Sequence, residues 1–67
     1  MESIGSRVKA IRKDQGLTMK QFGARIGISD AAVSQIESGK NGISEQSIIA
    51  ICKEFNVSEV YLRTGAE

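Results

Sequence analysis

The sequence predicts an all-α domain of five short helices, and three observations support this fold class. None of the 67 residues is proline, so no position interrupts a helix. Hydrophobic residues make up 40% of the chain and recur at spacings of three and four, the period of an amphipathic helix. Glycine or asparagine follows each apolar stretch and marks its end. A chain of this length forms one small domain, residues 1–67, of modest stability.

The first helix is expected to run from near Ile4 to Gln15, and Gly16 ends it. Its inner side is formed by three apolar residues at helical spacing: Ile4, Val8 and Ile11. We expect the basic residues of this helix to point mostly outward: Arg7, Lys9, Arg12 and Lys13.

The second helix is predicted to begin at Met19. Thr18 and Gln21 form a capping-box pattern, in which a hydroxyl and an amide satisfy backbone donors at a helix start. Gly23 has no side chain, so a second helix can cross close to it. The core-facing side of this helix is formed by two residues that are four positions apart: Phe22 and Ile26.

A tight turn leads into the third helix. Gly27 supplies the left-handed conformation that ends the second helix, and it forms the turn together with Ile28. Ser29 is a favourable N-cap for a helix over residues 30–38, which Gly39 ends. The buried side of the third helix is formed by two residues: Val33 and Ile36.

A fourth helix is predicted over residues 45–55, with Ser44 as its N-cap and Asn56 at its end. The loop before it contains an Asn-Gly turn signal and consists of four residues: Lys40, Asn41, Gly42 and Ile43. We expect Ile43 to attach this loop to the core. The inward side of the helix is formed by residues that recur at helical spacing: Ile48, Ile51, Cys52 and Phe55. We interpret Cys52 as a small core residue, because nothing near it in the sequence would stabilise a thiolate.

The last helix is brief, capped by Ser58 and ended by Gly65. It carries three residues of apolar character: Val60, Tyr61 and Leu62. Val57, just before it, is expected to enter the core. Two interpretations stay open for Val57, Val60 and Tyr61, which either form a self-association surface or belong to the core of one chain.

The order of hydrophobic, glycine and capping residues resembles the Xre family of phage-repressor-like DNA-binding domains. The resemblance is carried by the following residues: Phe22, Gly23, Ile26, Gly27, Ile28, Ser29, Val33, Ile36, Glu37 and Gly39. The segments SRVKAIRKDQGLT and SIIAICKEFNVSEVYLRTG look like the first helix and the last two helices of that family. The resemblance implies a helix-turn-helix over about residues 18–38, in a regulator of transcription, a repressor, that binds a two-fold operator as a homodimer.

The third helix would then lie in the major groove of double-stranded DNA. Four of its residues match base-contacting positions of the family and point away from the predicted core: Asp30, Ala31, Ser34 and Gln35. Gln35 is the foremost candidate, since its amide can pair with adenine N6 and N7, while Ala31 can pack on a thymine methyl group. The alternative is an ordinary solvent-facing helix surface. Asp30 either accepts a hydrogen bond from cytosine N4 or stabilises the positive end of its own helix.

Phosphate contacts would position the protein on DNA without reading sequence. The resemblance and the helix starts assign them to seven residues: Thr18, Met19, Lys20, Ser29, Ser38, Lys40 and Asn41. The family often carries glutamine where Met19 stands, and a methionine side chain cannot donate a hydrogen bond, so Lys20 would replace part of that contact. The alternative for the last three residues is a solvated loop. Arg12 and Glu37 match positions that pair in relatives, or else are independent surface charges.

Composition restricts the other classes of function. The net charge is only +1, so charge alone does not indicate DNA binding. With no histidine, no metal-ligand cluster and no glycine-rich phosphate loop, we expect neither an enzyme nor a cofactor. A single cysteine and the lack of a long apolar stretch predict a cytoplasmic protein without membrane contact. The alternative function is an antitoxin-like or assembly module that uses the same fold to bind protein.

Overall fold

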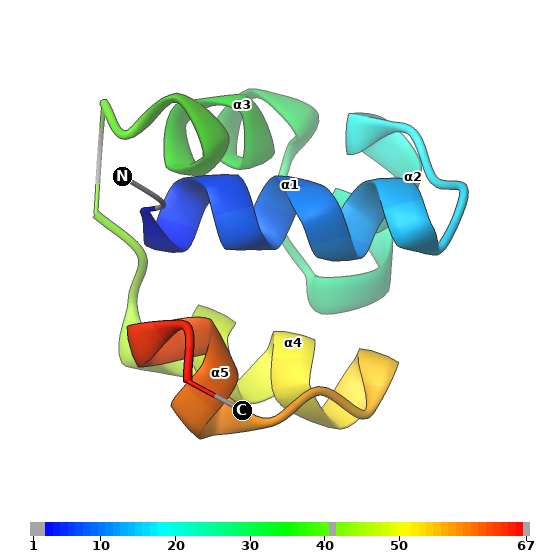
Figure 1. The fold of residues 1–67 in the computed structure, drawn as a ribbon. Coiled ribbons are helices and arrows are strands. Elements are labelled where there is room, and N and C mark those ends of the chain that lie inside the picture. Colours follow the sequence, from blue (N-terminus) through cyan, green and yellow to red (C-terminus); the bar gives the residue numbers. More distant parts are fainter. Residues whose placement is uncertain (1–2, 41, 67) are drawn as a thin grey trace.

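The computed structural model describes residues 3–40 and 42–66, and this part of the chain contains five α-helices and no strand (Figure 1). The helices span the following residues: α1 Ile4–Asp14, α2 Met19–Ile26, α3 Asp30–Ser38, α4 Glu45–Phe55 and α5 Glu59–Thr64. The predicted all-α fold is therefore confirmed. Only the first helix ends earlier than expected, because Gln15 is its C-cap. No helix in the described ranges is both long enough and apolar enough to span a membrane.

Each helix begins at a hydroxyl side chain that accepts a hydrogen bond from a backbone N–H in its first turn. At α2 the predicted capping box is present, since Thr18 Oγ1 accepts from Gln21 N at 3.1 Å and Gln21 Oε1 accepts from Thr18 N at 2.9 Å. Gly27 ends α2 with a φ of 82°, in the left-handed region. Asn56 ends α4 in the same region, with a φ of 55°.

The core lies between all five helices. Nine hydrophobic side chains are buried in it: Val8, Ile11, Phe22, Val33, Ile36, Ile48, Ile51, Phe55 and Leu62. Phe22 and Phe55 stack with ring centroids 4.9 Å apart, and the guanidinium of Arg25 lies 5.2 Å from the centroid of Phe55. Cys52 and Val57 pack against this core while staying partly exposed. Burial raises the pKa of the Cys52 thiol, which disfavours the reactive thiolate form.

In Figure 1, α1 crosses the middle of the domain, α3 lies above it, and α4 and α5 lie below. α1 contacts both α3 and α5, and α2 packs against α3 and α4. α1 therefore connects the helix-turn-helix to the C-terminal part of the domain.

The contact between α1 and α3 depends on Gly5, a position for which no sequence pattern predicts a role. A Cβ atom at Gly5 would lie 2.3 Å from the carbonyl oxygen of Ile36 and 3.0 Å from that of Glu37. At Gly23 the neighbouring backbone is also very close, but it belongs to the turn, because a Cβ there would lie 2.5 Å from the carbonyl oxygen of Ile28. The same Cβ would lie 3.2 Å from the carbonyl oxygen of Ser29, the N-cap of α3, so the close approach predicted at Gly23 is made by the turn and the start of α3.

A bidentate ion pair also joins α1 to α3. Arg12 Nε and Nη2 donate to the two carboxylate oxygens of Glu37 at 2.7 and 3.1 Å, and Arg12 Nη1 donates to the carbonyl oxygen of Leu17 at 3.0 Å. The side chains are only 11% and 4% exposed. The hydrogen bonds to Glu37 raise the pKa of the Arg12 guanidinium. Arg12 is therefore not an outward-pointing charge.

The prediction that Arg7 points outward is wrong. Arg7 is 6% exposed, and it donates from Nε to the carbonyl oxygen of Leu62 at 2.9 Å and from Nη2 to that of Arg63 at 3.1 Å. Carbonyl groups in the last turn of a helix lack partners within that helix, and a cation close to them is favourable. Arg7 therefore attaches the end of α5 to α1, whereas Lys9 and Lys13 are exposed as expected.

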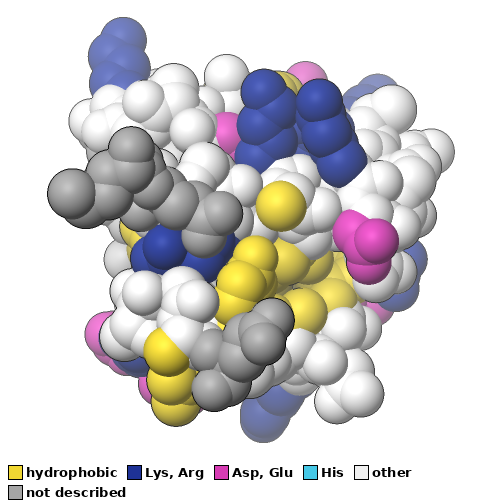
Figure 2. Space-filling view, viewed as in Figure 1, with side chains coloured by type: hydrophobic (Ala, Val, Ile, Leu, Met, Phe, Trp, Pro, Cys, Tyr) yellow, Lys and Arg dark blue, Asp and Glu magenta, His cyan; other side chains and the backbone are white. Residues whose placement is uncertain are grey.

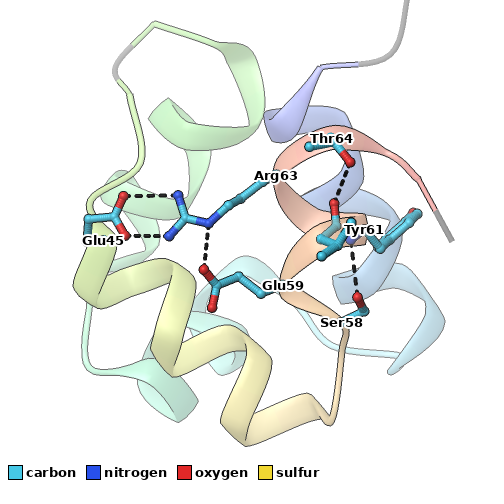
Figure 3. Close-up of polar contacts among 7 residues, drawn as sticks. Glu45, Ser58, Glu59, Tyr61, Arg63 and Thr64 are labelled. Atoms are coloured by element: carbon cyan, nitrogen blue, oxygen red, sulfur yellow. Dashed lines mark hydrogen bonds and ion pairs between the residues drawn. The ribbon is translucent and has the colours of Figure 1, made fainter.

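Arg63 joins α5 to the start of α4 (Figure 3). It donates to both carboxylate oxygens of Glu45 and, through Nε, to Glu59 at 2.7 Å. These bonds lower the pKa of Glu45 and raise that of Arg63. Both groups face solvent, so we assign this network little stability and a role in orientation.

We expect the substitution Gly5→Ala to lower the free energy of unfolding by about 2 kcal/mol, because the new Cβ would displace the backbone of α3. Gly42→Ala is the matched control, since a Cβ there meets nothing within 4 Å. Urea denaturation followed by circular dichroism measures both changes. Equal stability of the two variants would contradict the close α1–α3 contact.

The substitution Glu37→Ala should lower the free energy of unfolding by about 3 kcal/mol, because it leaves a largely buried guanidinium without its carboxylate. The double variant Arg12→Met/Glu37→Met should lose less, since neither charge remains. The same denaturation experiment distinguishes the two. A loss below about 1 kcal/mol for Glu37→Ala would show that the pair behaves as two surface charges.

Candidate nucleic-acid interface

α3 has one buried side and one exposed side, and the structure places all four predicted base-contacting residues on the exposed side. Val33 and Ile36 are 0% and 8% exposed and form the buried side. The exposed side is formed by the following residues: Asp30, Ala31, Ser34 and Gln35. A helix that presents a row of small and polar side chains to solvent has the shape that a DNA major groove accepts.

The first turn of α3 is stabilised by its own side chains. Ser29 Oγ accepts a hydrogen bond from Ala32 N at 3.1 Å, and Asp30 Oδ1 accepts one from Ala31 N at 2.8 Å. This bond favours the interpretation of Asp30 as a residue that stabilises the positive end of its helix. Ser29 likewise has a structural partner, while its side chain stays exposed.

At the start of α2, the candidate phosphate-contacting residues differ in their surroundings. Thr18 and Lys20 are exposed, whereas Met19 is partly buried and packs against the core. The Met19 side chain therefore contributes to packing, and only its backbone is suited to a phosphate oxygen. A helix N-terminus attracts anions through its N–H groups and its dipole, and Lys20 adds a formal charge beside it.

The end of α3 carries a second group of candidates. Ser38 Oγ donates to the carbonyl oxygen of Gln35 at 3.1 Å and lies 3.3 Å from Lys40 N, which donates to it. Lys40 N also donates to the carbonyl oxygen of Gln35, at 3.1 Å. These bonds fix the backbone of Lys40 directly behind α3 and leave its side chain exposed. Asn41, the last predicted phosphate contact, lies outside the described residues.

Arginine and lysine have different roles in the described part of the chain. Every arginine there is bound to a carbonyl or carboxylate of the fold: Arg7, Arg12, Arg25 and Arg63. No lysine forms an ion pair within residues 3–40 and 42–66. The positive charge left for a partner is therefore carried by lysines, which act as point charges and do not pair in a bidentate way. Composition alone does not separate these two uses.

A groove of about 210 Å³ lies beside Gln35, between α3 and the start of α4. It is lined by seven residues: Ile28, Ala32, Gln35, Ile36, Gly42, Ser44 and Ser47. No local sequence pattern predicts this groove, because residues from four separate segments form it. Among the described residues, no group of three histidine, cysteine or acidic side chains is placed to hold a metal ion.

Comparison with known proteins agrees with this geometry. A family model described as helix-turn-helix matches residues 8–62. The chain is 40% identical over 57 residues to the antitoxin PezA of Streptococcus pneumoniae, and this match covers 85% of the chain. It is 39% identical over 49 residues to the HTH-type transcriptional repressor RghR of Bacillus subtilis, and this match covers 73% of the chain. Each match spans only 36% of the relative.

Among solved structures, the chain is similar to the P22 c2 repressor, determined in complex with a synthetic operator. The TM-score is 0.90 at 27% sequence identity, with 98% of this chain and 100% of the repressor chain covered. The resemblance to phage repressors that the sequence indicated is thus confirmed. Because the family model covers most of its length, the chain belongs to this helix-turn-helix family of DNA-binding domains.

Proposed function

We propose that this protein regulates transcription as a sequence-specific repressor and reads DNA with α3. The observation that carries the proposal is the exposed side of α3, with Gln35 on it, in a fold that matches an operator-bound repressor at a TM-score of 0.90. Family and fold are those of DNA-binding regulators and not of enzymes.

In this proposal α3 lies in the major groove, which is about 12 Å wide, with its exposed side towards the bases. Gln35 pairs with adenine N6 and N7, and such a bidentate contact discriminates between bases by roughly 1 to 3 kcal/mol. Ala31 and Ser34 contact neighbouring base edges. Asp30 mainly stabilises its own helix, and its charge keeps the overall affinity moderate.

The phosphate contacts come from the two groups that lie at the start of α2 and behind α3. Thr18, Met19 and Lys20 offer backbone N–H groups and one charge, while Ser38 and Lys40 offer the other charge. Few charges predict a shallow dependence of affinity on salt, because each neutralised phosphate releases one set of counterions. Specificity therefore depends on α3 more than on electrostatic attraction.

We further propose that two copies bind a two-fold operator and associate through α5. Hydrophobic side chains gather between α1 and α5 (Figure 2), around a hollow of about 360 Å³. The hollow is lined by the following residues: Ala10, Ile11, Asp14, Val57 and Tyr61. Val60 is 58% exposed. Val57 and Tyr61 pack partly against the core, so Val60 is the residue most available to a second copy.

The similarity to PezA favours one second candidate, an antitoxin-like module that uses the same fold chiefly to bind protein. The two candidates make different demands on the exposed side of α3. A repressor needs it to read bases, whereas a module that chiefly binds protein does not. An enriched DNA sequence, bound with an affinity that decreases as salt is raised, would favour the repressor.

Selection from a random duplex library tests the function and assigns roles to two residues. We expect Gln35→Ala to weaken the base preference at one position in each half-site. The salt dependence of DNA affinity should stay similar to that of the unaltered protein. Lys40→Ala should weaken binding to all sequences alike and reduce the salt slope by about one for each copy bound. Titration of fluorescent duplexes at several salt concentrations measures both effects. Selection that enriches no sequence would contradict the proposed function.

The dimer proposal is tested by placing a charge on α5. Val60→Glu should lower the affinity for a two-fold operator by at least tenfold, because a buried carboxylate opposes association, while affinity for a single half-site stays the same. Ile49→Glu is the matched control, since Ile49 is 45% exposed on α4. Analytical ultracentrifugation with operator DNA gives the stoichiometry. Equal effects of the two variants would exclude α5 as the contact.

A further inference from the structure

We propose that Arg7 is a positioning residue that sets the distance between the two half-sites read by a pair of copies. Its guanidinium attaches α5, the helix of the proposed contact between copies, to α1, and α1 in turn holds α3. The inference rests on the proposed function and on association through α5. It goes beyond them by assigning the spacing of the half-sites to one side chain.

The beginning of α1 contacts the ends of two helices that lie on opposite sides of it (Figure 1). Gly5 lies against the last turn of α3, where a Cβ atom would be 2.3 Å from the carbonyl oxygen of Ile36. Two residues later, Arg7 Nε donates to the carbonyl oxygen of Leu62 at 2.9 Å, and Nη2 donates to that of Arg63 at 3.1 Å. One short stretch of α1 therefore holds the reading helix and α5 relative to each other.

Two other contacts of α5 constrain its direction less. Arg63 connects it to Glu45 at the start of α4, but this pair is exposed, and water competes for such bonds. Leu62 is fully buried and fixes the depth of α5 in the core, yet hydrophobic contact has no direction of its own. Arg7 is 6% exposed and binds two successive carbonyl oxygens with one planar group, which fixes both distance and angle.

The spacing of the half-sites depends on the angle between α5 and α1. Adjacent base pairs differ by a rise of about 3.4 Å and a turn of about 34°, so a spacing changed by one base pair demands a turn of about 17° from each copy. α5 has six residues and a length of about 9 Å, and such a turn around its start would move its end by about 2.6 Å. Both bonds of Arg7 would then be broken, so Arg7 opposes a change of spacing.

The test measures affinity for operators in which the two selected half-sites stand one base pair closer or farther apart than in the preferred operator. For the unaltered protein we expect a loss of affinity of about tenfold, since a rigid pair of copies fits one spacing. For Arg7→Met the loss should be only about threefold, because α5 is no longer fixed to α1. Affinity for a single half-site should stay the same, since Arg7 is buried between α1 and α5 and does not belong to the exposed side of α3.

Two further variants separate a positioning role from a general loss of stability. Arg7→Lys keeps the charge but replaces the planar group with a point charge, so its loss of affinity at changed spacing should be intermediate. Arg25→Met is the matched control, because Arg25 pairs with Glu54 at 2.6 Å and joins α2 to α4 instead of α5 to α1. It should behave as the unaltered protein does. Thermal unfolding establishes which variants are folded, and Arg7→Lys decides the question if Arg7→Met is not.

Three results would overturn the inference while leaving the proposed function intact. They are a spacing preference that neither Arg7 variant weakens, an equal weakening by Arg25→Met, and a loss of single half-site affinity that accounts for the whole effect of Arg7→Met, as a merely structural role would produce. Failure to enrich any operator would instead refute the DNA-binding role, and one copy bound to each operator would refute the association of two copies.

Discussion

The contact between α1 and α3 is the constraint on which the rest of the structure depends. Glu37 is 4% exposed, and both of its carboxylate oxygens are bound by Arg12. Gly5, on the same helix as Arg12, allows the backbones of α1 and α3 to come into contact. Both contacts act on the last turn of α3, the helix that carries Gln35. A short helix on a small core gains a fixed direction only if such contacts hold it, and base recognition requires a fixed direction.

Arginine and lysine have different roles because of the way this small domain is held together. Arginine has a planar group with several donors, so it can join a carboxylate or a pair of carbonyl oxygens from another helix. Arg7 and Arg63 use this property to attach α5 to α1 and α4. Lysines stay on the surface, where a partner can use their charge. The exposed lysines therefore offer DNA more positive charge than the modest net charge of +1 suggests.

The groove beside Gln35 and the hollow beside α5 are two separate depressions of the surface. The groove is formed where the loop after α3 brings the start of α4 close to the reading helix. The hollow is formed where α5 returns to α1. The two depressions are thus formed by different helices, because α5 packs against α1 while the start of α4 lies beside α3.

By itself, the sequence determined the features that depend on neighbouring residues. Helix starts at Thr18 and Ser29, the end at Gly27 and the exposed side of α3 all follow from spacing and capping, which act over one or two turns. Contacts between residues far apart in the chain were decided only by the tertiary structure. The burial of Arg7 against carbonyl groups 55 and 56 residues away, the need for glycine at position 5 and the groove at Ala32 arise from packing that no local pattern encodes.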